Sequence, residues 1–504
     1  MTKTKRIISF LLTPLLIIYV LIFVKLDPGN PSVTYTFCVA LLMAVWWITE
    51  AVPLAVTSLI PVALFPLFGI MDGKEVSSAY FNDVIFLFMG GFLVALAMQR
   101  WGLHKRIALH ILHFIGTGPA RILLGFMFAS FFLSMWISNT ATAMMMLPIA
   151  LSVIHQLEEL VSKKNISRYS IGLLLGIAYG ASIGGVATLV GTPPNLSFSR
   201  IFHIYFPAAP EIAFTNWLVF ALPFSILFFV VAWLYLYFSF KPNKDEWVKP
   251  EKNTFGNQLK SLGKTTQEER VVFVVFVLLS FLWLFRTDLE IGFFKIPGWS
   301  NIFSNSKYIN DGTVAIMMAL VLFLVPSSRN KHTTLLDWNT AAKLPWHILL
   351  LFGGGFALAS GFKVSGLSLW FGGQLEWVSE YNIFIVILFI SLIMTFLTEL
   401  TSNTATTEIL LPVLAGIAIH TEINPLLLMI PATLSASMAF MLPVATPPNA
   451  IIFGTSRITI GQMARTGLAL NLIGALIISL MMYFWGSYVF DINLAEFPEW
   501  AFIK

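Results

Sequence analysis

The sequence predicts an all-α polytopic membrane protein with about 11 transmembrane helices and two re-entrant helical hairpins, arranged as two inverted repeats. Composition is the first observation behind this prediction, since 57% of the 504 residues are hydrophobic and only 11% are charged. The mean hydropathy is +0.83. A soluble core cannot hide so much apolar surface. The second observation is that apolar runs recur along the chain, and the third is an internal duplication of polar motifs within them.

The N-terminal segment, residues 1–33, carries an apolar run over 7–24. This run is longer than the apolar part of a signal peptide and lacks a small-residue cleavage site, so we expect a retained helix. Basic residues at Lys3, Lys5 and Arg6 place the N-terminus in the cytoplasm. The C-terminal tail, 490–504, is then expected on the extracellular or periplasmic side of the plasma membrane.

Residues 34–240 and 271–489 are predicted to be the two repeats. The stretch Trp-Ile-Ser-Asn-Thr-Ala-Thr over 136–142 returns as Leu-Thr-Ser-Asn-Thr-Ala-Thr over 400–406. The same offset aligns 88–92 with 352–356 without a gap, which chance in an apolar chain does not readily give. Such self-similarity indicates an internally duplicated protein.

Each repeat contains an apolar segment that is too long for one crossing. These segments, 122–156 and 382–420, have Ser-Asn-Thr near their middle. As one helix each would measure about 50 Å, whereas the bilayer core is about 30 Å thick. We therefore predict a re-entrant hairpin for each, with its tip at Ser-Asn-Thr.

Each repeat also contains a predicted broken helix, over 169–199 and 424–456. Both carry Thr-Pro-Pro-Asn, at 192–195 and 446–449. The two prolines remove backbone donors and bias the preceding threonine away from helix, so upstream carbonyls lose their partners. Irregular backbone at membrane depth is tolerated only where it is buried in protein or lines a cavity. A purely structural kink is the alternative interpretation.

The repeats are joined by a polar linker over 241–270, which carries seven Lys or Arg residues. We interpret it as a cytoplasmic segment lying partly on anionic lipid. The sequence pI of about 9.1 has the same topological origin, so no nucleic-acid partner is expected. With the linker inside, the two hairpins enter from opposite sides. Inverted repeats with broken helices are typical of secondary transporters, whose binding site lies where the repeats meet.

Ser-Asn-Thr at a hairpin tip places hydroxyls and an amide beside the free N–H groups that begin the next helix. Helix N-termini attract anions, and these side chains offer both donors and acceptors. Ser138 and Ser402 could instead serve only as helix caps. No Lys, Arg, Asp or Glu occurs over 170–199 or 424–456. A bound anion would therefore need cations that enter with it, which favours cation coupling.

Three carboxylates are expected at membrane depth: Glu50, Glu399 and Glu408. Intramembrane carboxylates are costly and often functional, so proton coupling is an alternative. None of the three has an acidic counterpart in the other repeat, and Glu399, beside Thr398, is the most plausible of them.

These motifs resemble those of the divalent anion sodium symporter family, which carries dicarboxylates, citrate and sulfate. The resemblance rests on both Ser-Asn-Thr motifs, both Thr-Pro-Pro-Asn motifs and Ile48–Pro53. It also rests on the stretch 437–449, which fits the family pattern up to Ile452, where that pattern has valine. The resemblance implies a homodimer in the lipid bilayer, with a scaffold domain and a transport domain that moves as an elevator.

The resemblance also implies the binding residues. Sodium site 1 would use Ser134, Ser138, Asn139 and the Gly191 carbonyl, and sodium site 2 would use Thr398, Ser402, Asn403 and the Ala445 carbonyl. The substrate carboxylates would contact the two tips and the second break, at Ser138, Asn139, Thr140, Ser402, Asn403, Thr404, Thr446 and Pro447.

The predicted function is sodium-coupled import of a C4 dicarboxylate such as succinate, fumarate or malate, with Na⁺ as coupling ion and no organic cofactor. One alternative is a sodium-independent dicarboxylate exchanger, and another is a carrier of citrate or sulfate. An anion channel would call for basic pore-lining residues. An enzyme is not expected, because the spans lack a catalytic constellation of His, Cys or carboxylates.

Overall fold

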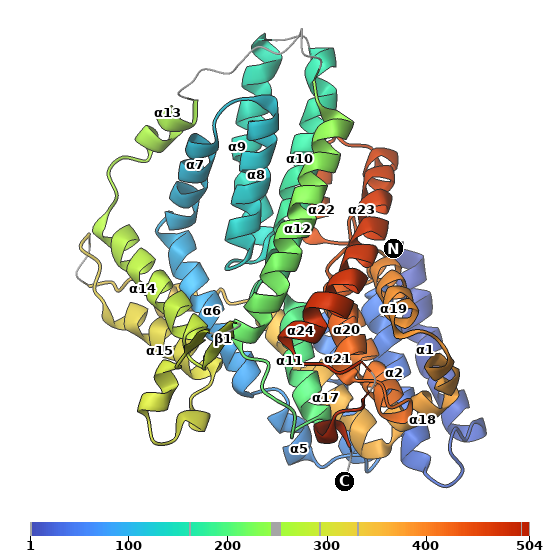
Figure 1. The fold of residues 1–504 in the computed structure, drawn as a ribbon. Helices are drawn as coiled ribbons and strands as arrows, with labels where there is room; N and C mark the ends of the chain where they lie inside the picture. The colour runs from blue at the N-terminus through green and yellow to red at the C-terminus, as the bar shows by residue number, and fades with distance from the viewer. Residues whose placement is uncertain are drawn as a thin grey trace.

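The computed structural model describes residues 3–160, 163–242, 254–291, 294–329, 332–494 and 496–502. Nearly all regular structure in these residues is helical (Figure 1). By length and composition, seven helices in the described chain can each cross a membrane, and shorter apolar helices accompany them. The prediction of a polytopic helical membrane protein is confirmed.

Helices of the first half run from the N-terminus to the linker. They are α1 (Lys3–Phe23), α2 (Pro31–Thr49), α3 (Leu54–Thr57), α4 (Ile60–Leu67), α5 (Gly73–Ser78), α6 (Asp83–Arg100), α7 (Leu103–Ile115), α8 (Pro119–Ser134), α9 (Asn139–Leu160), α10 (Lys163–Val186), α11 (Pro193–Tyr205), α12 (Phe214–Phe240) and α13 (Thr254–Ser261).

Helices of the second half follow a similar order. They are α14 (Gln267–Leu284), α15 (Asp311–Leu324), α16 (Trp338–Ala341), α17 (Trp346–Ser365), α18 (Leu367–Gln374), α19 (Ile383–Thr398), α20 (Asn403–His420), α21 (Pro425–Ala436), α22 (Pro447–Phe453), α23 (Ile460–Met481) and α24 (Ser487–Val489). Short 3₁₀ or π turns are η2 (Trp299–Ile302), η3 (Ser306–Tyr308), η4 (Glu376–Glu380), η5 (Met482–Gly486) and η6 (Glu499–Ala501).

Two details depart from the sequence prediction. A short antiparallel pair, β1 (Leu289–Ile291) and β2 (Phe294–Ile296), follows α14, so the fold is helical apart from this pair. The apolar run over 55–71, one of those from which the transmembrane helices are predicted, is divided into α3 and α4 around Ser58 and Leu59. Pro61 lies in the first turn of α4, where its missing N–H costs no hydrogen bond, so a new helix can begin there.

The predicted hairpin segments contain helix breaks at their motifs. Residues 135–138 separate α8 from α9, and 399–402 separate α19 from α20, so each Ser-Asn-Thr lies where a second helix begins. The predicted broken helices are interrupted at 187–192 and 437–446, directly before each Pro-Pro pair. Proline is favoured at a helix start and cannot continue a preceding helix, which explains both positions.

Glycines allow the first hairpin and the first broken helix to pack closely. A Cβ on Gly184 of α10 would lie 2.1 Å from the Phe131 carbonyl oxygen of α8, and one on Gly180 would lie 2.6 Å from that of Met127. Figure 1 shows α8, α9, α10 and α12 side by side. Small residues at such crossings are the usual means of close helix packing in membranes.

Equivalent positions of the two halves meet at the centre. Phe88 of α6 and Phe352 of α17 occupy corresponding places beside the glycine runs, and their rings touch edge to face with centroids 5.1 Å apart. On its other side, α6 packs along α15, where Gly90 faces Ala315.

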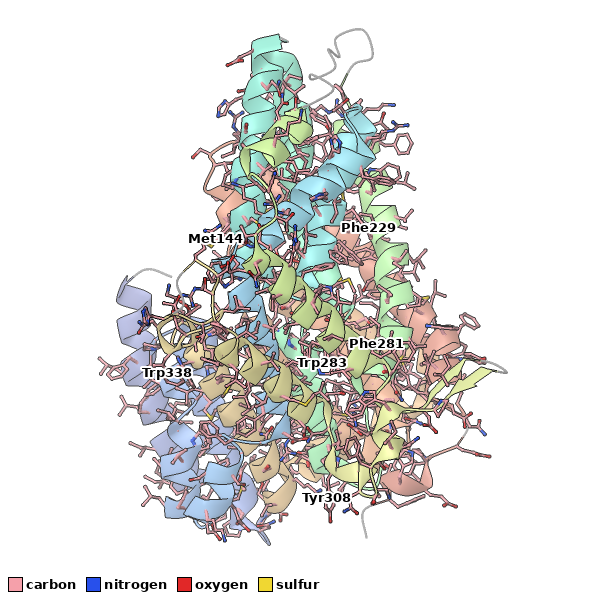
Figure 2. All side chains as sticks on the ribbon, turned by 90° about the vertical axis from the view of Figure 1, so that its left-hand side faces the viewer. Met144, Phe229, Phe281, Trp283, Tyr308 and Trp338 are labelled. Carbon is pink, nitrogen blue, oxygen red and sulfur yellow. The ribbon has the colours of Figure 1, made fainter. Side chains whose placement is uncertain are left out.

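The outward faces of the helices are apolar. On α14, Phe281 is 54% exposed while Trp283 is buried, and Figure 2 shows such side chains standing out from the ribbon. A hollow of about 470 Å³ beside α19 and α20 is lined mainly by apolar side chains such as Phe389, Met394 and Leu414. Exposed apolar belts of this kind suit contact with lipid rather than water.

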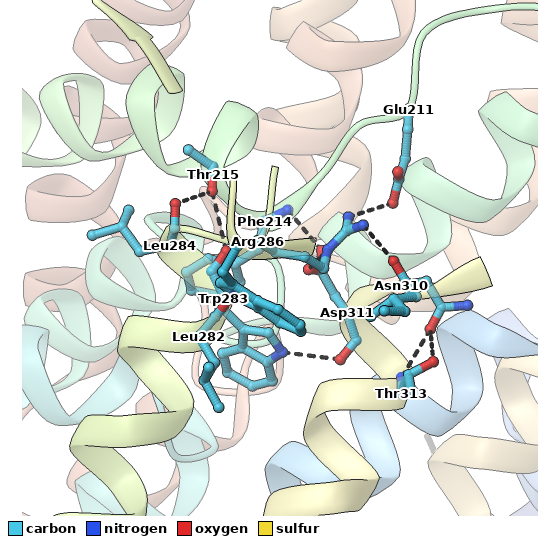
Figure 3. Close-up of polar contacts among 12 residues, drawn as sticks. Glu211, Phe214, Thr215, Leu282, Trp283, Leu284, Arg286, Asn310, Asp311 and Thr313 are labelled. Carbon is cyan, nitrogen blue, oxygen red and sulfur yellow. Dashed lines mark hydrogen bonds and ion pairs between the residues drawn. The ribbon is translucent and has the colours of Figure 1, made fainter. Parts of the chain in front are cut away.

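A polar cluster, in which Arg286 and Asp311 are buried and Glu211 is exposed, ties the beginning of α12 to α14 and α15 (Figure 3). Arg286 donates to Asp311 at 2.5 Å and to Glu211 at 2.6 Å. Asp311 also accepts the backbone N–H of Phe214 at 2.8 Å, and its carbonyl accepts the Trp283 indole at 3.0 Å. Buried charges persist when they are paired in this way.

Candidate functional site

The first hairpin tip brings together the side chains expected at sodium site 1. Asn139 begins α9, and its Oδ1 accepts a hydrogen bond from the buried Ser134 hydroxyl at the end of α8. Gly185 faces this amide, since a Cβ there would lie 2.6 Å from Asn139 Oδ1 and 3.1 Å from the Gly191 carbonyl oxygen. The missing Cβ atom therefore leaves a small space where amide and carbonyl oxygens converge.

The second tip repeats the main contact of the first. Thr398 donates to Asn403 Oδ1 at 2.6 Å, as Ser134 does to Asn139, and also contacts the Ala436 carbonyl at 2.8 Å. A hydroxyl at the end of α19, an amide oxygen at the start of α20 and a carbonyl at the end of α21 thus form a second cluster. In the part of the chain that the structure describes, no group of three His, Cys, Asp or Glu could hold a metal ion.

The two serines of the motif differ in their roles. Ser138 Oγ accepts the Ala141 N–H at 3.2 Å, so the capping interpretation applies to this serine. Ser402 makes no side-chain cap bond to α20. The N–H groups of the first helical turn lack intrahelical partners, and both α9 and α20 direct them towards the tip.

The asparagines of Thr-Pro-Pro-Asn hold the breaks together. Asn195 Nδ2 donates to the carbonyls of Val186 at 3.2 Å and Thr188 at 2.7 Å. In the second repeat, Asn449 Nδ2 donates to Ala439 and Leu442, both at 3.1 Å. These side chains satisfy carbonyls that the helix break releases, which explains how irregular backbone is tolerated there.

The carbonyls predicted as cation ligands are not those that the asparagines satisfy. Neither the Gly191 nor the Ala445 carbonyl accepts any of the hydrogen bonds found in the described residues. Both residues are buried. Unwound backbone carbonyls of this kind coordinate Na⁺ in transporters with broken helices.

Each tip accepts hydrogen bonds from its own break, but through different groups. In the first repeat the Thr188 hydroxyl donates to the Met135 carbonyl at 2.5 Å. In the second repeat, Glu399 occupies the position of Met135, and its carboxylate accepts the N–H groups of Met441 at 2.8 Å and Leu442 at 2.9 Å. Asn471 of α23 donates to the same carboxylate at 2.7 Å.

These contacts change the interpretation of Glu399. Both of its oxygens accept hydrogen bonds from groups that define the second break, so the residue has a clear structural task. The sequence did not identify this task, nor those of Asn195 and Asn449, although the duplicated Asn was a usable signal. Glu50 lies at the end of α2 with positive φ.

Helix packing crosses between the repeats. The second hairpin helix of the first half, α9, packs against α22, and its counterpart α20 packs against α11. At the base of α9, Glu158 pairs with Arg457 beyond α22 at 2.6 Å. Each hairpin therefore contacts the broken helix of the other half.

The two breaks differ in exposure. Val444 and Pro447 beside the second break are exposed, Val444 by 81%, whereas the equivalent Val190 is only 7% exposed. Thr446 and Thr404 are buried, and Ser138, Asn139, Thr140, Ser402 and Asn403 are partly exposed. The second break is therefore more exposed than the first in this conformation.

Known proteins agree with the motifs. Residues 5–492 match the family described as the sodium:sulfate symporter transmembrane region. The sodium-dependent dicarboxylate transporter SdcS of Staphylococcus saprophyticus is 41% identical over 497 residues, covering 97% of this chain and 93% of that protein. SdcS of Staphylococcus aureus is 42% identical over 500 residues, covering 98% and 94%.

Solved structures support the fold. The YdaH transporter of Alcanivorax borkumensis has a TM-score of 0.56 at 16% identity, covering 84% of this chain and 88% of that one. MtrF of Neisseria gonorrhoeae has a TM-score of 0.56 at 13% identity, covering 93% and 96%. Family and relatives are transporters rather than enzymes. The chain is a multi-pass bacterial-type membrane transporter and belongs to the sodium:sulfate symporter family, the divalent anion sodium symporters that its motifs predicted.

Proposed function

We propose that this protein imports C4 dicarboxylates such as succinate, fumarate and malate by symport with two or more Na⁺. Relatives more than 40% identical over nearly the whole chain are named sodium-dependent dicarboxylate transporters. The observation that carries the proposal is the pair of matched oxygen clusters around Asn139 and Asn403. Because the breaks carry no charged side chain, two negative charges on a substrate need cations that bind with it.

The proposed sodium ligands fall into two equivalent sets. Site 1 comprises Ser134, Ser138, Asn139 and the Gly191 carbonyl, and site 2 comprises Thr398, Ser402, Asn403 and the Ala445 carbonyl. The substrate carboxylates would bind at the tips, to the serine, asparagine and threonine of each Ser-Asn-Thr, with Thr446 and Pro447 alongside. Free N–H groups at the starts of α9 and α20 favour the anion.

We place the opening beside Val444 and Pro447 on the cytoplasmic side. In the proposed topology the first hairpin enters from the cytoplasm, and the Glu158–Arg457 pair ties the end of α22 to the base of that hairpin. Alternating access would then require the hairpins and broken helices to move as one transport domain past a scaffold that includes α6 and α17. The repeat boundaries at 34–240 and 271–489 rest on the internal duplication of the sequence, and the homodimer and the elevator motion rest on family resemblance.

The test is uptake of labelled succinate into proteoliposomes under an inward Na⁺ gradient, with K⁺ replacement and with unlabelled succinate preloaded inside. Symport requires Na⁺ and no internal anion. Uptake that ignores Na⁺ but needs preloading would make the protein an exchanger, and competition by citrate or sulfate would reveal a different preferred anion.

Asn139→Ala tests the site within the same assay. Hydrogen bonds and contacts to charged partners are worth about 1.5–3 kcal/mol, so the Na⁺ concentration for half-maximal uptake should rise at least about tenfold. Asn382→Ala, which removes the exposed cap of α19, is the matched control. Unchanged sodium activation in Asn139→Ala would show that the site assignment is wrong.

A further inference from the structure

Glu408 of α20 is buried in an unusual way. The other buried carboxylates of the described chain, Glu268, Glu269, Asp311 and Glu399, each accept two or more hydrogen bonds. The fully buried Glu408 accepts one, from the Ser197 hydroxyl of α11 to Oε1 at 3.1 Å, and Oε2 has no partner. Its oxygens therefore lack the donors that normally accompany a buried negative charge.

The carboxyl group is pressed against the backbone of α17. A Cβ on Gly355 would lie 2.2 Å from Glu408 Oε2, so only glycine leaves room for the group. On the neighbouring side, Gly354 packs on Ser58, whose carbonyl accepts the Tyr80 hydroxyl at 2.5 Å. Contacts this close admit a proton but not a hydrated metal ion.

The charged and titratable groups of the surrounding helices have other partners. Lys363 of α17 donates to the Ile204 and Tyr205 carbonyls at the end of α11, and the Tyr205 hydroxyl donates to the Ala359 carbonyl. His420, at the far end of α20, lies 3.8 Å from Glu376. Among the ion pairs formed by described residues, none includes Glu408.

We propose that Glu408 is a proton-binding site and that α20 packs against α17 only when this carboxyl group is a neutral acid. An uncompensated buried charge costs several kcal/mol, whereas a neutral acid with one hydrogen bond costs far less. The inference rests on the proposed motion of α20 past α17. When α20 leaves α17 the group meets water and releases its proton, and it must recover a proton before the packed state can return.

The experiment measures Na⁺-driven succinate uptake in proteoliposomes with equal pH inside and outside, from pH 6.5 upwards through the alkaline range. A water-exposed carboxyl is already mostly ionised at pH 6.5, so the wild-type rate should fall from there into the alkaline range, by up to about tenfold per pH unit where recovery of the proton limits the cycle. Glu408→Gln, which copies the shape and neutrality of the acid, should remove this alkaline fall. Glu376→Gln, an exposed carboxylate variant, should behave as wild type.

Thermal unfolding of the purified variants gives a second reading that does not need transport. A group that is neutral when folded and ionised when unfolded makes the folded state less stable as pH rises. The melting temperature of Glu408→Gln relative to that of wild type should therefore increase as the pH rises from neutral to alkaline. The inference would be overturned if the melting-temperature difference between Glu408→Gln and wild type did not change with pH, or if Glu408→Gln did not fold. It would also be overturned if uptake by Glu408→Gln fell with rising pH as wild-type uptake does. Absence of Na⁺-driven uptake in wild type would instead refute the proposed function, while the melting comparison would still decide the proton site.

Discussion

Glu399→Gln should disrupt the second break, because the carboxylate of Glu399 is its main polar anchor. In the substituted protein one oxygen can still accept from Met441 and Asn471, but the amide nitrogen faces the Leu442 N–H. An unsatisfied buried N–H costs about 1–3 kcal/mol. Two charge-assisted bonds become neutral and lose roughly half their strength, about 1 kcal/mol each. The expected total is about 3–5 kcal/mol.

This loss should appear in both folding and transport. A cost of about 3 kcal/mol changes the equilibrium between the ordered and loosened break by roughly a hundredfold, so succinate uptake should fall at least about tenfold. The melting temperature of the purified protein should fall as well, while Glu376→Gln leaves both unchanged. If Glu399 served as a coupling acid instead, Glu399→Gln would alter the pH dependence of uptake without lowering the melting temperature. Wild-type uptake and wild-type melting together would refute the anchoring role.

Three further predictions concern stability. Gly184→Ala places a Cβ 2.1 Å from a backbone carbonyl oxygen and should destabilise the fold by about 3 kcal/mol or more, so that no monodisperse protein elutes in size-exclusion chromatography. Gly461→Ala places its Cβ in open space and should leave the elution profile unchanged. Arg286→Met leaves the Asp311 carboxylate buried without its cation and should lower the free energy of unfolding by about 3–5 kcal/mol. Adding Asp311→Asn should recover part of the lost stability. An unchanged melting temperature of Arg286→Met would contradict the prediction. Burial raises the pKa of Glu268, but the hydrogen bonds it accepts outweigh this and lower the pKa from 4.5 to about 2. The stability that it contributes is present above pH 4.5 and lost as pH falls towards 2, so the melting difference between wild type and Glu268→Gln should narrow from pH 7 to pH 4.

The helix breaks could be predicted from the sequence because the signals that produce them are local. Proline and helix-capping residues act over two or three positions, and both Ser-Asn-Thr motifs and both Pro-Pro pairs lie at the start of a helix. Duplication made these signals specific. The family could be identified from the same residues, because they lie in one long pattern that covers nearly the whole chain.

Partners from distant segments could not be predicted. Glu399 was a candidate for proton coupling because nothing nearby in the sequence indicated Asn471 as its donor. Likewise, the isolation of Glu408 depends on Gly355 of another helix, and only the three-dimensional packing shows that this carboxyl lacks a second donor. A single sequence shows that a carboxylate lies within an apolar segment, but it does not show which groups donate hydrogen bonds to that carboxylate.

The different ties of the two breaks match their different exposure in this conformation. The first break is covered, with Val190 buried, so packing supports it and one hydroxyl bond from Thr188 is sufficient. The second break has Val444 exposed by 81%, so much of the packing is absent and the hydrogen bonds to Glu399 replace it. If the protein opens to the other side, the first break must be exposed while it is held by the weaker tie. Thr188→Val removes the hydrogen bond to the Met135 carbonyl, which is needed most when the first break is exposed. The variant should therefore lower the rate of succinate uptake strongly while lowering the melting temperature only slightly.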